Sequence, residues 1–194
     1  MKVIGLTGQT GAGKSTVAKV LTEQGCYHID ADLVARKVID GDSAVKKMLA
    51  NHFGEGIIGE DGKILRPELA KRAFANAESV KALNAITHPA VTEKIRSILK
   101  EKENEGLKGA IIDAIALFES GENSLCDFTV AVTAPLEIRL ERIMKRDGID
   151  RERALERINA QKDEEFFTER CDYIIKNYPP HDTMEQILKI TQQI

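Results

Sequence analysis

Residues 8–16 of the chain, with the sequence GQTGAGKST, constrain its fold more than any other stretch. Their spacing matches the pattern G-x-x-x-x-G-K-[ST], in which a glycine-rich loop binds phosphate. An apolar run at 3–6 precedes the loop, and Val17, Val20 and Leu21 follow it at helical spacing. In the order strand, loop, helix, backbone N–H groups and a helix N-terminus face an anion. We therefore predict a phosphate-binding loop rather than a turn that only connects two elements.

The residues of this loop predict its ligands. Glycines at 8, 11 and 13 allow positive φ angles and let the backbone approach a ligand closely. Lys14 is placed to reach the β- and γ-phosphates of a nucleotide, and the Ser15 hydroxyl is placed to bind Mg2+. ATP and Mg2+ are the expected ligands, and the predicted nucleotide-binding residues are Gly11, Ala12, Gly13, Lys14, Ser15 and Thr16.

Length and composition narrow the class of protein. A chain of 194 residues with 42% hydrophobic residues can form one domain with a full core and an insertion. The net charge is −3 without a block of like charge, which argues against general nucleic-acid binding. No apolar run has transmembrane length and the chain starts with a strand pattern, so we expect neither membrane insertion nor a signal peptide. Three distant cysteines without a C-x-x-C pair predict no disulfide framework or zinc site, and favour the reducing cytoplasm.

Apolar runs mark five strands, separated by helical patterns. The predicted strands are residues 3–6, 26–29, 110–113, 128–133 and 173–175. Between Asp30 and Lys108 the pattern is helical, and Pro89 is expected to start a new helix there. The last helix is predicted to start at an Asp182 capping box and to carry the apolar residues Met184, Ile187, Leu188 and Ile194. This alternation predicts an α/β fold with a parallel sheet and a ligand crevice at the carboxyl ends of its strands.

Aspartates lie at the ends of two of these strands. Asp30 and Asp32 follow the second strand, and Asp113 ends the third. A carboxylate at such a place can orient a hydroxyl and accept its proton during phosphoryl transfer. Asp32 is the candidate base and Asp30 a candidate metal or structural residue, with helix capping as an equally favoured alternative for both. Asp113 is placed like the acidic residue of a Walker B element, where it would hold Mg2+ through water, or it is an ordinary turn former.

A group of arginines follows the fourth strand. Arg139, Arg142 and Arg146 lie at i, i+3 and i+7 of one predicted helix, and more arginines come after it. Basic side chains on mobile helices near a phosphate site are typical of a lid that closes over ATP. The alternative is an exposed helix face on which the arginines pair with glutamates. For a single arginine the alternative is favoured, and the group predicts a lid only together with the phosphate loop.

Taken in order, the motifs resemble the dephospho-coenzyme A kinase family across nearly the whole chain. The matching pieces are GLTG at 5–8 with GAGKST at 11–16, IDAD at 29–32 with AR at 35–36, ITHP at 86–89, LFE at 117–119, Arg142 with Arg146-Asp147, Arg157-Ile158 with Ala160-Gln161, and Asp172 with Asn177. The chain departs from the family at three places. These are Ile115-Ala116 instead of the usual Pro-Leu, Arg139 instead of a frequent glutamine, and Tyr178-Pro179 instead of the usual Asn-Gly.

The resemblance implies a three-layer P-loop kinase fold with a five-stranded parallel sheet. Its parts would be a core at about 1–30, 108–138 and 171–194, a helical acceptor-binding region at about 31–107 and a helical lid at about 139–170. The implied reaction is ATP-dependent phosphorylation of the ribose 3′-hydroxyl of dephospho-coenzyme A, the last step of coenzyme A synthesis. Lys14, Asp32 and Arg142 would be catalytic, and Arg142 and Arg146 would bind ATP from the lid. The implied acceptor-binding residues are Asp32, Arg36, Arg66, Thr87, His88 and Pro89.

Two other functions share part of this pattern. Another small-metabolite or nucleotide kinase would keep the loop and the lid and differ in its acceptor. A nucleotide-binding switch would signal through a protein partner, but the Asp-Ala-Asp element and the arginines favour an enzyme. The sequence also lacks the Asn-Lys-x-Asp motif that reads guanine. We expect a cytoplasmic monomer or weak oligomer with dephospho-coenzyme A as its small-molecule acceptor, and no nucleic-acid, membrane or obligatory protein partner.

Overall fold

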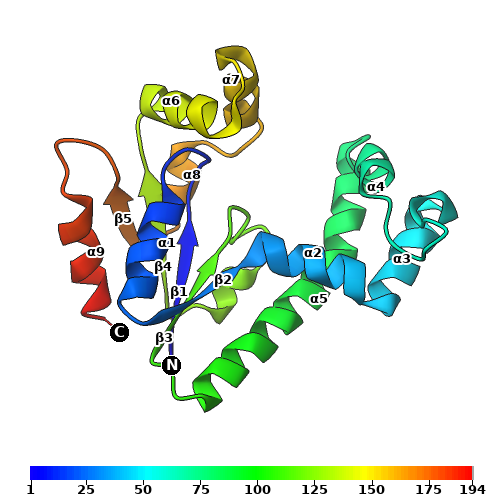
Figure 1. The fold of residues 1–194 in the computed structure, drawn as a ribbon, viewed down its shortest axis with the longest axis horizontal. Helices are drawn as coiled ribbons and strands as arrows, with labels where there is room; N and C mark the ends of the chain where they lie inside the picture. The colour runs from blue at the N-terminus through cyan, green and yellow to red at the C-terminus, as the bar shows by residue number, and fades with distance from the viewer. Residues whose placement is uncertain (194) are drawn as a thin grey trace. The chain divides into compact units, whose positions relative to one another are not determined.

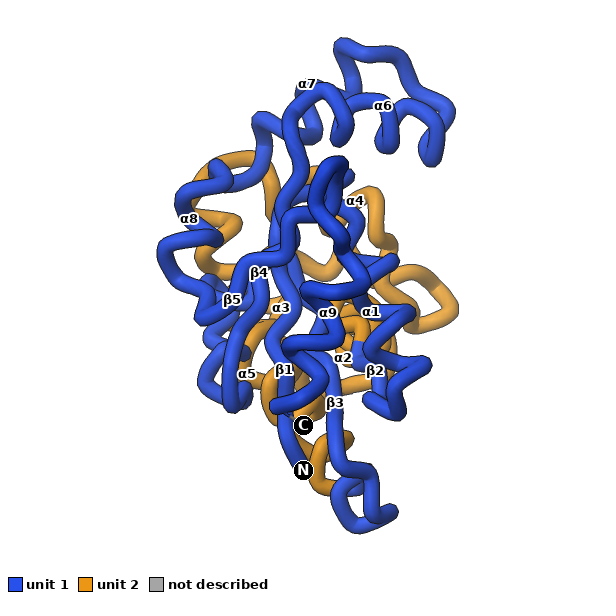
Figure 2. Tube along the Cα trace, turned by 90° about the vertical axis from the view of Figure 1, so that its left-hand side faces the viewer, with its two compact units in different colours: residues 1–29, 101–194 blue, residues 30–100 orange. Residues whose placement is uncertain are grey.

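The computed structural model describes residues 1–193, so Ile194, which was predicted as an apolar residue of the last helix, lies outside the described residues. The chain divides into two compact units, shown in two colours in Figure 2. The core unit comprises residues 1–29 and 101–194, and the helical unit comprises residues 30–100. Each unit is described by itself below.

The core unit is built on a five-stranded sheet (Figure 1). The strands are β1 (Lys2–Thr7), β2 (Cys26–Asp30), β3 (Gly109–Asp113), β4 (Phe128–Thr133) and β5 (Tyr173–Lys176). Their order is β2-β3-β1-β4-β5 and the sheet is parallel, which confirms the predicted α/β class. The register places Leu6 of β1 opposite Asp113 of β3. Because the strand order reverses around β1, a ligand crevice is expected at the carboxyl end of this strand, where the glycine-rich loop begins.

Helices of the core unit bury the sheet. They are α1 (Lys14–Glu23), the short 3-10 helix η2 (Glu122–Leu125), α6 (Leu136–Asp147), α7 (Arg151–Asn159), α8 (Glu164–Thr168) and α9 (Thr183–Thr191). Buried residues such as Ile4, Leu21, Val132 and Ile187 join α1 and α9 to the strands in one apolar cluster. Five of the six residues of β1 are buried, as expected for a parallel strand that is covered on both faces. A smaller apolar cluster holds α6 and α7 together.

The helical unit contains α2 (Ala31–Gly41), α3 (Ser43–Phe53), the 3-10 helix η1 (Glu55–Ile57), α4 (Arg66–Ala73) and most of α5 (Ala77–Asn104). Aspartate caps separate its first helices. The Asp42 side chain accepts hydrogen bonds from the N–H groups of Ala44 and Val45, at 2.8 and 3.1 Å, and so starts α3 directly after α2. The unit has an apolar interior of its own, to which Val38, Leu49, Ile57 and Ile95 contribute.

The helix α5 corrects one prediction. Pro89 does not start a helix but lies inside α5, which is continuous over 28 residues. His88, the residue before Pro89, likewise lies inside α5 and not at the start of a helix. Proline removes one backbone donor from a helix interior, but burial of Val91, Ile95 and Leu99 on one face stabilises the continuous form. The burial of this face therefore outweighs the local tendency of a proline to interrupt a helix.

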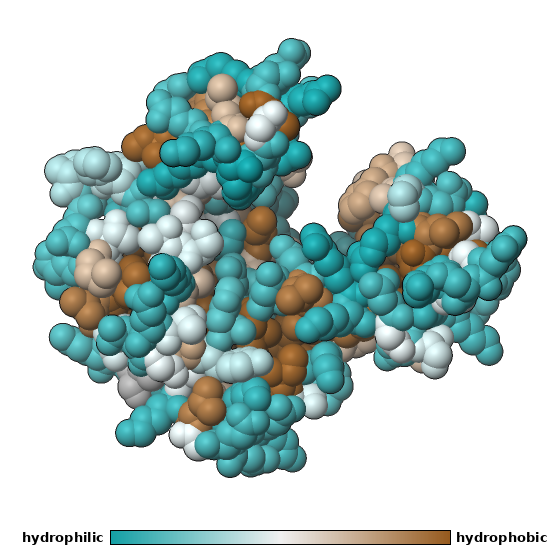
Figure 3. Space-filling model, in the orientation of Figure 1, coloured by the Kyte–Doolittle hydropathy of each residue, from teal (hydrophilic) through white to brown (hydrophobic). Residues whose placement is uncertain are grey.

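The surface agrees with the composition. Most side chains on the face seen in Figure 3 are hydrophilic, in keeping with the 30% of charged residues. Over residues 1–193, no helix combines the length and the apolar character that crossing a membrane would require.

Candidate active site

The glycine-rich loop joins β1 to α1 in the core unit. Gly8, Gly11 and Gly13 have φ angles of 129°, 78° and 97°, in the region that side chains disfavour. A Cβ atom on Gly8 would lie 2.3 Å from the carbonyl oxygen of Val132, and one on Gly13 would lie 2.0 Å from Nδ2 of Asn177. Both distances are far too short for a real contact. The glycines are thus required by conformation and by close approach together.

Side chains from α6 and from the segment after β5 hold the outer side of this loop. Nη1 of Arg142 donates to the carbonyl oxygens of Gly11 and Ala12, at 3.2 and 3.0 Å. Nδ2 of Asn177 donates to the Ala12 carbonyl at 2.8 Å. In a planar trans peptide the next N–H points away from the carbonyl. The N–H of Gly13 is therefore directed to the opposite, inner side of the loop, where successive amides form a cradle for an anion.

The first turn of α1 completes the cradle. The helix begins at Lys14, and N–H groups of a first turn have no acceptor within the helix. Nζ of Lys14 lies 3.3 Å from the carbonyl oxygen of Gly8, so its ammonium group lies beside the loop. Ser15 and Thr16 are exposed on the same turn. These groups fit the phosphates of a nucleotide, because N–H dipoles, the helix N-terminus and a cation all favour negative charge.

Asp113 lies at the carboxyl end of β3, next to β1. Its Oδ2 atom lies 3.4 Å from Nε2 of His28 on β2, a pairing that the sequence did not indicate. Among residues 1–193, no group of three or more His, Cys, Asp or Glu side chains could hold a metal by itself. One carboxylate, that of Asp113, and one hydroxyl, that of Ser15, are a donor set that fits Mg2+. This ion keeps several waters and binds through one or two protein oxygens together with substrate phosphates.

The predicted acceptor residues of α2 and α4 belong to the helical unit. Asp30 is the N-cap of α2, and its Oδ1 accepts a hydrogen bond from the N–H of Leu33 at 2.9 Å. Asp32 lies in the first turn of α2 and is exposed. Asp32, Arg36 and Asp40 are spaced by four residues and share one face of the helix. Arg66 contacts this face, because its Nη2 donates to Oδ2 of Asp40 at 2.7 Å.

The predicted Thr-His-Pro element lies within α5. Thr87 is buried, and its hydroxyl donates to the carbonyl oxygen of Leu83 at 2.9 Å, one turn earlier. This bond satisfies the hydroxyl within the helix. His88 is half-buried and Pro89 is exposed.

The three arginines of α6 have different environments. Arg139 is only 5% exposed and Arg142 is half-buried against the loop. Arg146 is exposed and pairs with Asp147, which Arg157 of α7 also contacts. Arg146 and Arg157 both lower the pKa of the Asp147 carboxyl below its usual value, with the hydrogen bond from Arg146 as the largest cause. Glu137, in the first turn of α6, pairs with Arg151 of α7.

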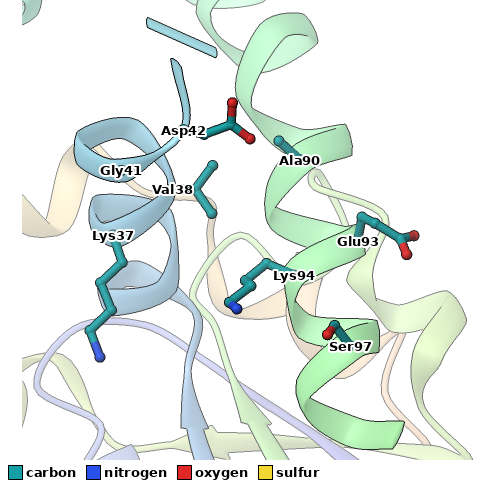
Figure 4. A pocket seen from close by; sticks show the side chains of 8 residues that line it. All are labelled: Lys37, Val38, Gly41, Asp42, Ala90, Glu93, Lys94 and Ser97. Atoms are coloured by element: carbon teal, nitrogen blue, oxygen red, sulfur yellow. The ribbon is translucent and has the colours of Figure 1, made fainter. Parts of the chain in front are cut away.

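Each unit also has a cavity of its own. The core unit has one of about 300 Å³, lined by Ile115, Ala116, Glu119, Ala160, Gln161, Lys162 and Phe167. The helical unit has a groove of about 610 Å³ between α2 and α5, and Figure 4 shows its eight lining residues. In this view Lys94 points toward α2, whereas Glu93 points away from it. The predicted acceptor residues do not line this groove.

Two glutamines that hold the phosphate loop in place could not be identified as such from the sequence. Gln9 is buried, and Gln161 accepts a hydrogen bond from the N–H of Thr10 at 2.7 Å. In the sequence, Gln161 stands out only as part of a family motif. Glutamine side chains carry no distinctive chemical pattern, so only the position of Gln9 inside the motif could have drawn attention to it.

Comparisons with known proteins agree on one family. A family model described as dephospho-CoA kinase matches residues 2–181. A dephospho-CoA kinase of Carboxydothermus hydrogenoformans is 40% identical over 194 residues, covering 100% of this chain and 94% of the relative. The solved structure of TT1252 from Thermus thermophilus is 33% identical, with a TM-score of 0.80 and coverage of 99% of this chain and 96% of that one.

A second solved structure extends this agreement to a named kinase. The dephospho-CoA kinase from Campylobacter jejuni is 29% identical to this chain, with a TM-score of 0.71. The match covers 100% of this chain and 97% of the Campylobacter chain. Sequence, fold and the geometry of the phosphate loop therefore point in one direction, and the chain belongs to the dephospho-CoA kinase family.

Proposed function

We propose that this kinase transfers the γ-phosphoryl group of ATP to the ribose 3′-hydroxyl of dephospho-coenzyme A, giving coenzyme A and ADP. The observation that carries the proposal is the phosphate loop, built on three glycines with positive φ, in a chain that matches dephospho-CoA kinases over its full length. The loop would supply the site for a nucleoside triphosphate. Family membership supplies the identity of the acceptor.

The nucleotide would be held by the core unit. Lys14 and the N–H groups of the loop would bind the β- and γ-phosphates, where negative charge moves during transfer. Mg2+, when bound, would neutralise charge on the same phosphates, with the Ser15 hydroxyl as a ligand and Asp113 acting through water. Arg146 is exposed on α6 and free of the loop contacts that engage Arg142. We assign Arg146 and Arg142 to the ATP side of a lid at about 139–170.

The acceptor would be held by the helical unit, at about 31–107 in the predicted division of the chain. Asp32 would accept the proton of the 3′-hydroxyl while the hydroxyl oxygen forms a bond to the γ-phosphorus of ATP. The bond between the γ-phosphorus and the β–γ bridging oxygen breaks in the same step, and that oxygen leaves with ADP. Support for Asp32 over Asp30 comes from the capping bond that engages Asp30. The remaining acceptor contacts are assigned to Arg36, Arg66, Thr87, His88 and Pro89.

A turnover assay tests the proposal. Release of ADP would be measured with ATP, Mg2+ and a panel of acceptors: dephospho-coenzyme A, AMP, adenosine and shikimate. We expect release that depends on dephospho-coenzyme A, and a loss of at least ~10²-fold in Lys14→Ala, which also controls for contaminating kinases. Faster turnover of another acceptor would favour the alternative kinase. Tight ATP binding without turnover of any acceptor would favour a switch protein.

The cellular setting is also a proposal. We place the enzyme in the cytoplasm as a monomer or weak oligomer without an obligatory protein partner, since its substrates are small anionic metabolites. Light scattering of the purified protein over a range of concentrations tests the oligomeric state, and an oligomer whose mass does not fall on dilution would contradict the proposal.

A further inference from the structure

Arg139 of α6 reaches behind the phosphate loop. Its Nε donates to the carbonyl oxygen of Thr10 at 3.0 Å, and its Nη1 donates to Oε1 of Gln9 at 2.6 Å. The contact is close, because a Cβ atom on Gly11 would lie 2.7 Å from the carbonyl oxygen of Arg139. Since the Thr10 carbonyl points toward Arg139, the N–H of Gly11 points toward the inner side of the loop. Arg139 thus orients the first peptide of the cradle.

The charge of Arg139 is poorly compensated. The side chain is 5% exposed, and no carboxylate among residues 1–193 forms an ion pair with it. Its Nη2 atom is buried without a hydrogen-bond partner in the described chain. Burial lowers the pKa of this guanidinium, an effect that the charge of Glu164 only partly offsets. A buried cation whose hydrogen-bond partners are all neutral is unfavourable, so this position is expected to serve something that carries negative charge.

The location of this cation indicates what it serves. We propose that Arg139 is a positioning residue for ATP, which orients the Thr10 peptide of the phosphate loop and places behind it a positive charge that the phosphates neutralise. The inference rests on the proposed function only in taking a nucleoside triphosphate as the ligand of the loop. It does not depend on the identity of the acceptor. A neutral side chain such as glutamine at this position could orient the peptide but could not supply the charge.

The test compares Arg139→Gln with the wild-type chain and with Arg151→Gln. Arg151 provides a matched control, because the same change removes one arginine from an exposed ion pair with Glu137. The dissociation constant of ATP is measured calorimetrically with Mg2+, together with Tm without ligand and KM for both substrates. For Arg139→Gln we expect ATP to bind about tenfold more weakly, the scale of losing a hydrogen bond to a charged group. KM for dephospho-coenzyme A and Tm are expected to stay near the wild-type values.

Two outcomes would overturn the proposal. One is an ATP dissociation constant of Arg139→Gln within twofold of wild type. The other is a lower Tm with equal weakening of both substrates, which would make Arg139 part of the scaffold. A second variant, Gln9→Met, removes the neutral partner of Nη1, together with the hydrogen bond that Nε2 of Gln9 donates to the Lys162 carbonyl at 2.8 Å. It should weaken ATP binding less, in the same direction. Because ATP binding is measured without an acceptor, failure of the proposed reaction would leave this result unaffected.

Discussion

Asp30 and Asp32 show how two neighbouring carboxylates acquire different duties. Asp30 ends β2 and caps α2 through its bond to the N–H of Leu33. Asp32 is two residues further on, in the first turn of α2, where a negative charge is favoured by the helix dipole. From the sequence, either aspartate could have capped α2, and in the structure Asp30 does so. This leaves Asp32 as the candidate base.

The substitution Asp32→Asn tests that role. Asparagine keeps the shape and one oxygen of the side chain but cannot accept the hydroxyl proton. We expect ATP and dephospho-coenzyme A to bind about as in wild type, and turnover to fall at least ~10²-fold, the low end for general-base catalysis. The measurement is kcat with saturating ATP, Mg2+ and acceptor.

Asp30→Asn is the matched control for this variant. Asparagine caps a helix as well as aspartate does, so both stability and turnover should survive the change at position 30. Wild-type turnover in Asp32→Asn, or a large loss in Asp30→Asn, would move the assignment of the base to Asp30.

At the scale of elements, α6 combines two kinds of arginine that a sequence cannot separate. Arg142 donates to the backbone carbonyls of Gly11, Ala12 and Asn177, the last at 2.9 Å. The Arg146 side chain is 59% exposed. Arg146→Ala should therefore lower kcat/KM for ATP with Tm almost unchanged, since exposed ion pairs contribute about 0–1 kcal/mol. Arg142→Ala should lower both, because it leaves partly buried carbonyls without donors.

Steady-state kinetics and thermal melts of both variants, with Arg151→Ala as an exposed control, separate these effects. Equal loss of Tm in Arg142→Ala and Arg146→Ala would contradict the structural distinction between them. Normal kcat/KM in Arg146→Ala would remove this residue from the lid.

The helix α5 offers a second test at this scale. Pro89→Ala restores a backbone donor opposite the Ala85 carbonyl, so the free energy of unfolding should rise by about 1–3 kcal/mol. If Pro89 shapes the acceptor site, KM for dephospho-coenzyme A should rise in the same variant. Denaturant unfolding and steady-state kinetics measure the two quantities. Unchanged or lower stability would show that α5 is already relaxed around the proline.

The elements also show which features a sequence can predict. The five strands, the loop and the cap at Asp182 depend on neighbours in sequence, and their predicted positions hold. Capping by Asp30 was one of two alternatives that the sequence left open, and the structure shows this bond. The break at Pro89 was wrong because long-range burial decides the fate of a proline in a helix. The hydrogen bond from Arg139 to Gln9 joins residues 130 positions apart, so no local sequence pattern could predict it.

At the scale of the whole molecule, the cysteines report on folding. Burial raises the pKa of Cys126 to about 12, from an ordinary value of 9.0, with smaller contributions from Glu122, Asp127 and Cys171. The folded state thus disfavours the thiolate, whereas the unfolded chain ionises normally. For an acid whose pKa is raised on folding, the stabilisation is complete below the unfolded pKa and is lost as pH rises toward the folded value. The pH window is therefore about 9 to 12.

Within this window the free energy of unfolding should fall as pH rises. Between pH 8 and pH 10 the Cys126 thiol alone should lower it by about 1–2 kcal/mol, since one pKa unit corresponds to about 1.4 kcal/mol. Other groups titrate there too, so the measurement is urea unfolding of wild type and Cys126→Ala at both pH values. The alanine variant should be less stable at pH 8 because a cavity forms, yet lose less stability on going to pH 10. Equal losses in the two proteins would show that Cys126 is not protected from ionisation by the fold.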